Sequence, residues 1–165
     1  MKESKNDKLD LMILQENLDK INILIGIIKE VANVLKKGYN ERIYQNAIIY
    51  ELSLKDISFT SEEMIPITYK DKYIGSERAD IICDPKWLDI IIELKAVSAE
   101  IKEDALLQVL TYMKQKKYTF GLFVNFNQSI KKDLEYIVVV SQEESSYIYN
   151  MDENSATVLD DNYFK

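Results

Sequence analysis

Apolar residues in the first quarter of the chain recur every three or four positions. This spacing predicts one long amphipathic helix over residues 8–36. Its apolar positions are Leu11, Leu14, Leu18, Ile21, Ile25, Ile28, Ala32 and Leu35. Gly38 is expected to cap its carboxyl end. Two interpretations are open. The helix is part of the domain core, or its seam, which also fits a coiled coil, forms a homodimer through the first 20 residues.

Two further helices are predicted by the same period. One covers residues 41–55, with Asn40 as its N-cap and Ile48 and Leu52 on its apolar face. The other covers residues 101–116, with Leu106 and Leu110 facing inward.

Between and after these helices the apolar period changes to two, which predicts β-strands. The predicted strands are 64–69, 73–83, 87–95, 119–126, 136–140 and 147–149. Pro66 indicates that the first is an edge strand, and Gly75 allows a bulge in the second. Residues after Met151 form a polar, acidic tail without a clear period. We therefore expect a mixed α/β protein, with residues 1–165 forming one domain.

Composition narrows the chemistry. Histidine is absent, which excludes His-ligated zinc and Ser-His catalysis, and the single Cys83 lies in an apolar run typical of a core. The formal net charge of −7 argues against a strongly basic nucleic-acid clamp but allows a small basic groove. No signal-peptide core and no stretch of about 20 apolar residues is present, so a soluble, cytoplasmic protein that does not enter membranes is expected.

The strongest chemical signal is Asp80 followed by Glu93-Leu94-Lys95, at the ends of two apolar strand runs. Charged side chains are costly to bury unless they are paired or bind a metal. If the two strands pair antiparallel with Asp80 near Glu93, both carboxylates and the Lys95 amine converge. Such a group can bind a hard divalent cation and position a water. Other registers, or simple surface ion pairs, remain open at this point.

Other polar residues form weaker candidates. Glu41 and Tyr44 lie one turn apart on the second helix, where Glu41 also suits an ordinary helix start. Gln108 and Tyr112 lie one turn apart on the third helix. They are either ordinary solvent-facing residues, or Gln108 donates a hydrogen bond to a phosphate or a metal-bound water. Two roles are open for a group of lysines, which either lie on the solvated surface or contact a phosphate backbone. These are Lys114, Lys116, Lys117, Lys131 and Lys132.

Taken together, these residues resemble the GxxExxY proteins of the PD-(D/E)XK nuclease superfamily. The resemblance covers residues 23–140, with 1–22 as a helical extension and 151–165 as a tail. The motifs that carry it are Gly38-x-x-Glu41-x-x-Tyr44, Arg78-Ala79-Asp80, Glu93-Leu94-Lys95-Ala96-Val97, Gln108-x-x-x-Tyr112 and Gly121-Leu122-Phe123-Val124-Asn125-Phe126.

The resemblance implies a restriction-endonuclease-like αβββαβ core, in which helices flank a central mixed sheet. It implies Mg²⁺ or Mn²⁺ bound by Asp80, Glu93 and the Leu94 carbonyl. It also implies that Lys95 positions or activates water and that Glu41 and Gln108 assist. The expected substrate contacts are Tyr44, Arg78 and Tyr112.

Two alternative functions of different classes, an enzyme and a binding module, are therefore expected. The first is a metal-dependent nuclease acting on DNA or RNA. The second is a catalytically silent protein with the same fold that acts as a dimeric binding or scaffold module.

Overall fold

The structure, a computed structural model, describes residues 11–101, 103–142 and 145–159. It contains the three predicted helices, α1 (Leu11–Leu35), α2 (Glu41–Leu54) and α3 (Glu103–Lys116). The Asn40 side chain caps α2 by accepting a hydrogen bond from the Ile43 N–H, as predicted. The cap predicted for α1 is wrong. The helix ends at Leu35, three residues before Gly38, and the residue that follows it directly, Lys36, adopts the left-handed conformation with φ 59°.

Seven strands form one sheet, in which their order along the chain is also their order in space. They are β1 (Phe59–Tyr69), β2 (Lys72–Cys83), β3 (Ile90–Lys95), β4 (Phe120–Asn125), β5 (Glu135–Gln142), β6 (Ser145–Asn150) and β7 (Ser155–Val158). Only β3 and β4 pair in parallel, and α3 makes the crossover that a parallel connection requires. The predicted mixed sheet flanked by helices is therefore confirmed.

The edge strand and the bulge agree with their sequence signals. Pro66 lies in β1, which is at the edge of the sheet. The register shifts between Ile67 and Thr68, opposite Gly75 and Tyr73. No strand was predicted in the polar tail after Met151, but Ser155–Val158 pairs with β6 as a seventh strand. Its side chains are all exposed, so it carries no burial pattern from which a strand could be inferred.

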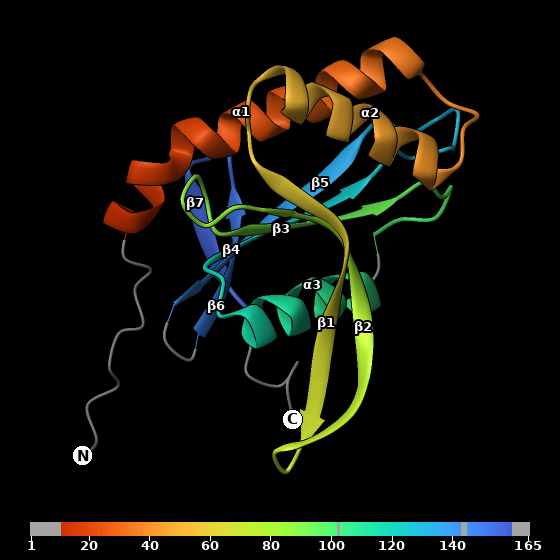
Figure 1. The fold of residues 1–165 in the computed structure, drawn as a ribbon. Coiled ribbons are helices and arrows are strands. Elements are labelled where there is room, and N and C mark those ends of the chain that lie inside the picture. The colour runs from red at the N-terminus through yellow and green to blue at the C-terminus, as the bar shows by residue number, and fades with distance from the viewer. Residues whose placement is uncertain (1–10, 102, 143–144, 160–165) are drawn as a thin grey trace.

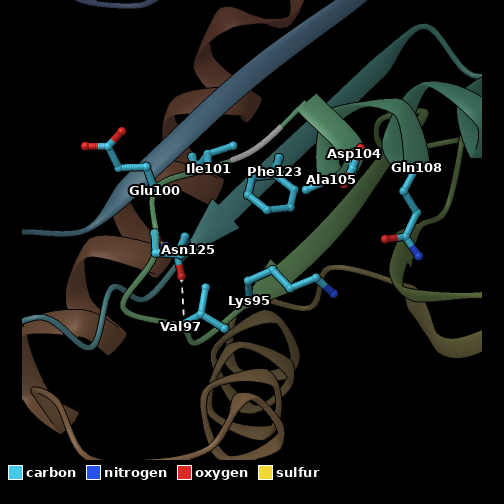
Figure 2. A pocket seen from close by; sticks show the side chains of 10 residues that line it. Lys95, Val97, Glu100, Ile101, Asp104, Ala105, Gln108, Phe123 and Asn125 are labelled. Atoms are coloured by element: carbon cyan, nitrogen blue, oxygen red, sulfur yellow. Dashed lines mark hydrogen bonds between the residues drawn. The ribbon is translucent and has the colours of Figure 1, made fainter.

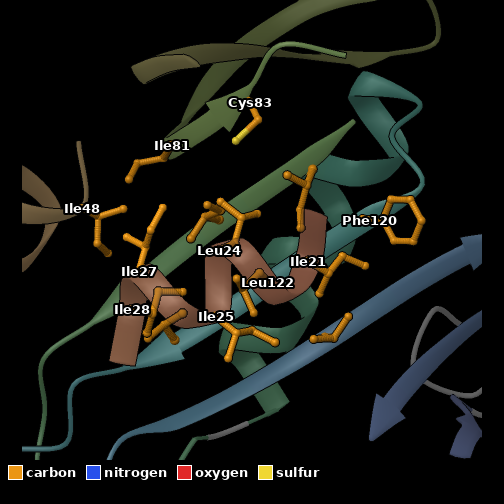
Figure 3. Packing of buried hydrophobic residues seen from close by; sticks show 14 of the residues in the cluster. Ile21, Leu24, Ile25, Ile27, Ile28, Ile48, Ile81, Cys83, Phe120 and Leu122 are labelled. Atoms are coloured by element: carbon orange, nitrogen blue, oxygen red, sulfur yellow. The ribbon is translucent and has the colours of Figure 1, made fainter. Parts of the chain in front are cut away.

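Helices α1 and α2 cover one face of the sheet and α3 covers the other (Figure 1). Figure 3 shows Ile21, Leu24 and Ile28 of α1 packed among side chains of β2 and β4. Cys83 is fully buried in this core, as expected. None of the helices in the described part of the chain is long and apolar enough to cross a membrane.

The seam of α1 is used inside the domain. Leu14, Ile21, Ile25 and Ile28, the seam residues expected to pair two chains, are at most 5% exposed and pack in the core. A side chain that is already buried against its own sheet is not available to a second copy of the chain. The core interpretation of this helix is therefore right for the described residues, and a homodimer through the first 20 residues stays a prediction. Residues 1–10, part of the proposed extension, lie outside the described residues.

Gly121 of β4 permits close packing of α3 on the sheet. A Cβ added there would lie 2.5 Å from both Val109 Cγ1 and Met113 Sδ. We expect Gly121→Ala to lower the free energy of unfolding by about 1–3 kcal/mol, because the β-branched Val109 cannot readily move away.

Gly26, exposed in the middle of α1, has no atom within 4 Å of an added Cβ and is the matched control. Gly26→Ala should raise stability by about 0.5–1 kcal/mol through helix propensity alone. Urea denaturation of both variants measures the difference. Equal stability of Gly121→Ala and the wild type would contradict the close-packing account.

Candidate functional site

Asp80 and Glu93 lie opposite each other on the neighbouring antiparallel strands β2 and β3. The register Ile81↔Ile92 and Ile82↔Ile91 places Asp80 opposite Glu93 one step further along. The Asp80 N–H donates to Glu93 Oε1 at 3.2 Å, and the Leu94 N–H donates to Asp80 Oδ2 at 2.8 Å. Each carboxyl group is thus fixed by the backbone of the other strand. The predicted convergence of the two acids is confirmed.

Both acids are buried, with Asp80 8% and Glu93 2% exposed. Burial, together with the charge of the nearby Asp80, raises the pKa of Glu93 to about 9. Burial also raises the pKa of Asp80, although the Leu94 N–H and the Lys95 charge act against it. Each carboxyl group also influences the pKa of the other. Without a cation, the raised pKa of Glu93 favours its protonated form at neutral pH.

Lys95 and Glu41 lie at the open side of this pair. Lys95 Nζ is 3.9 Å from Glu41 Oε2, and both side chains are about one-third exposed. Burial raises the pKa of Glu41, while the Lys95 charge lowers it and the Asp80 charge raises it. Glu41 therefore faces the same cleft as Asp80 and Lys95, as the second-helix motif suggested, and the Lys95 amine is the nearest positive charge.

Helix α3 contributes Gln108 and Tyr112 from the other side. Gln108 Nε2 donates to the Tyr112 hydroxyl at 2.7 Å, and that hydroxyl donates to the Arg78 carbonyl at 3.2 Å. Tyr112 is 1% exposed, so it is neither a solvent-facing residue nor a substrate contact. Its hydroxyl instead ties α3 to β2 and positions Gln108.

A pocket of about 260 Å³ opens beside Lys95. Figure 2 shows the Lys95 and Gln108 side chains extending from β3 and α3 toward the same space, while Glu100 points away. Phe123 forms part of its wall and Asn125 closes one end, where Asn125 Oδ1 accepts from the Val97 N–H at 3.1 Å. The pocket gives a ligand access to the Lys95 amine and the Gln108 amide together.

The two remaining expected substrate contacts differ. Arg78 is exposed and pairs with Glu62 at 2.7 Å, so its guanidinium is accessible. Tyr44 is fully buried, its ring stacks on Phe126 at 4.3 Å, and its hydroxyl donates to the Lys36 carbonyl at 2.7 Å. A buried ring with its hydroxyl already bonded cannot touch a substrate. Tyr44 therefore anchors α2, and the sequence-based role assigned to it is not supported.

Gln45 is a site residue that the sequence reasoning missed. It is 5% exposed, and its Nε2 donates to the Asp80 carbonyl at 3.1 Å and to Glu62 Oε1 at 2.9 Å. It thus fixes the backbone of Asp80 from α2. Its signal in the sequence was a polar residue one turn after Glu41, on the side of α2 that also carries Glu41.

The donor set suits a hard cation such as Mg²⁺. Two carboxylates that face each other in a buried position are unstable as a charged pair, and a divalent cation would compensate both charges. Among the described residues, no group of three or more acidic, cysteine or histidine side chains could form a metal cage. The remaining ligands would be the Leu94 carbonyl and water, which Mg²⁺ accepts readily.

Comparison with known proteins agrees with this geometry. The family model described as the PD-(D/E)XK nuclease superfamily matches residues 19–137, which include both buried acids and Lys95. No curated protein matches the chain. The order of helices and strands and the mixed sheet are consistent with a restriction-endonuclease-like fold.

Replacing the ionisable Glu93 by a neutral glutamine should stabilise the metal-free protein above pH 4.5. Because the folded state holds the Glu93 proton up to about pH 9 and the unfolded state releases it near 4.5, stability falls as pH rises between these values. Glu93→Gln removes this loss. In EDTA, its Tm relative to the wild type should increase steadily from pH 4.5 to 9 and remain constant below pH 4.

Thermal unfolding across that pH range measures the effect. Glu153→Gln, at an exposed site in the turn between β6 and β7, is the control and should show no such trend. A Tm difference for Glu93→Gln that is independent of pH would contradict the raised pKa.

Proposed function

The chain belongs to the PD-(D/E)XK nuclease superfamily, and on that basis we propose that it is a metal-dependent nuclease that hydrolyses phosphodiester bonds of DNA or RNA. The observation that carries the proposal is the buried Asp80–Glu93 pair with the Lys95 amine at its open side. A structural role does not account for two facing acids at a buried position, since like charges there reduce stability.

Each residue has a distinct proposed role. Asp80 and Glu93, with the Leu94 carbonyl, hold the cation. When bound, Mg²⁺ would supply positive charge to the phosphate oxygens and lower the pKa of a neighbouring water. Lys95 orients the attacking water and stabilises negative charge on the phosphoryl group. Glu41 holds the Lys95 amine in place and accepts a proton as its own raised pKa allows.

Gln108 and Arg78 act on the substrate rather than on the cation. Gln108 is oriented by the Tyr112 hydroxyl and donates from the pocket wall to a phosphate oxygen. Arg78 is exposed on β2, two residues before Asp80, and contacts a neighbouring phosphate. Within the superfamily we assign the chain to the GxxExxY group, because the Gly38-x-x-Glu41-x-x-Tyr44 motif gives both an acid facing the cleft and a buried tyrosine anchor for its helix.

Loss of either charged group should abolish cleavage. Glu93→Ala should leave no Mg²⁺-dependent activity above background, and Lys95→Ala should lose at least about a hundredfold in kcat. Cleavage of labelled single- and double-stranded DNA and RNA, together with circular dichroism to verify folding, measures this.

Lys72→Ala is the matched control for charge, because Lys72 lies at the exposed turn between β1 and β2. It should retain full activity. Equal Mg²⁺-dependent cleavage by the wild type and both site variants would show that the activity comes from elsewhere.

Cation binding should stabilise the wild type but not a variant that lacks the charge of Asp80. We expect Mn²⁺ to raise the Tm of the wild type, because it binds the folded state only. It should have little effect on Asp80→Asn, whose amide oxygen can still accept the Leu94 N–H but carries no charge. Calorimetric titration with Mn²⁺ should give a binding isotherm for the wild type and none for Asp80→Asn.

The catalytically silent binding protein makes the opposite prediction, namely no cation binding by either form. An absence of Mn²⁺ binding by the wild type would therefore favour that alternative.

A further inference from the structure

A second, larger concavity of about 650 Å³ lies on the other face of the sheet, between the end of α1 and the segment joining β4 to β5. Its rim carries Lys29, Lys36 and Lys37, and Tyr136 and Phe126 form part of its floor. Asp133 is the only acidic residue among the described residues that line it. We call this concavity the lysine groove.

The three groove lysines differ from two lysines elsewhere in the protein that carboxylates neutralise. Lys116 and Lys132 form ion pairs with Glu63 and Glu100. Within the described ranges, none of the three groove lysines forms an ion pair with a carboxylate. In a chain of net charge −7, three such ammonium groups around one concavity mark a local positive region.

The groove lysines instead contact neutral groups. Lys29 Nζ lies 5.7 Å from the centre of the Tyr136 ring, and Lys36 Nζ donates to Asn33 Oδ1 at 2.9 Å. Lys37 Nζ donates to the carbonyls of Asn127 and Lys132, which ties the end of α1 to the β4–β5 segment. Lys37 therefore shapes the groove, while Lys29 and Lys36 retain a full charge toward a ligand.

The groove borders the nuclease site. Gln128, on its wall, accepts from the Gly38 N–H at 2.7 Å, and its own N–H donates to the Val97 carbonyl at 3.2 Å. Val97 lines the pocket beside Lys95. The hydrogen bond between Gln128 and Val97 therefore links the wall of one concavity to the wall of the other. Figure 1 shows the α1–α2 turn, the end of β3 and the β4–β5 segment at the same end of the sheet.

We propose that the lysine groove binds the phosphate backbone of the nucleic-acid substrate several nucleotides away from the bond that is cut. The identity of the ligand rests on the proposed nuclease function, since a polynucleotide whose phosphate lies at Asp80 and Glu93 is long enough to reach a concavity on the far side of Val97 and Gln128. Lys29 and Lys36 each neutralise a phosphate, and this contact is independent of sequence. The substrate class is therefore a polynucleotide rather than a mononucleotide or a small phosphodiester.

Binding is tested without cleavage, in a Glu93→Gln background, by fluorescence anisotropy with a labelled 30-nucleotide single strand and a 30-base-pair duplex. Adding Lys29→Gln and Lys36→Gln together should weaken binding on the order of tenfold at 0.1 M salt. The slope of log Kd against log salt should fall by about 1.4 for the single strand or 1.8 for the duplex.

The matched control is Lys70→Gln with Lys72→Gln, which removes the same charge at the exposed β1–β2 turn. Its affinity should stay within about twofold of the Glu93→Gln parent. In the active protein, Lys29→Gln/Lys36→Gln should leave hydrolysis of bis(p-nitrophenyl) phosphate unchanged and raise KM for the 30-mers.

Equal loss of affinity in both double variants, or none in the groove variant, would overturn the proposal, as would a wild type that binds no nucleic acid. The two proposals fail separately. A protein that binds through Lys29 and Lys36 but does not cut refutes the nuclease function and keeps the groove. A protein that cuts 30-mers equally well without these lysines refutes the groove alone.

Discussion

The reciprocal contact between Asp80 and Glu93 is the constraint on which the rest of the site depends. Each carboxyl group accepts a hydrogen bond from the backbone of the opposite strand, which fixes the two acids face to face. Because both are buried, they cannot remain charged together without a positive partner. Without a cation, the raised pKa of Glu93 favours a proton on that carboxyl group, and a divalent cation would take the place of this proton.

The surrounding structure holds that pair from three directions. Gln45 of α2 bonds the Asp80 carbonyl, and Tyr112 of α3 bonds the Arg78 carbonyl two residues earlier. The parallel pairing of β3 with β4 fixes the strand that carries Glu93 and Lys95. Such support keeps the acids within reach of one cation, and it opposes the relaxation that would separate two like charges.

Much of this arrangement could be predicted from local patterns. Among the described residues, apolar periods of three to four and of two located each helix and each strand except β7, because an element buried on one face has apolar residues at regular intervals. The convergence of Asp80 and Glu93 followed from alternation along two consecutive strands. By contrast, β7 has only exposed side chains, and the roles of Tyr44, Tyr112 and Gln45 depend on contacts between α2 or α3 and distant segments. These contacts depend on the position at which each helix packs on the sheet, and this position has no signal in the local sequence.

The central claim is that one divalent ion binds between the two buried acids. The most direct measurement is the anomalous diffraction of Mn²⁺ in crystals of the wild-type protein. We predict one strong anomalous peak bonded to an oxygen of Asp80 and an oxygen of Glu93 at once, with Lys95 beside it. Crystals saturated with Mn²⁺ that show no peak there, with the Asp80 and Glu93 carboxyl groups still facing one another, would contradict the account.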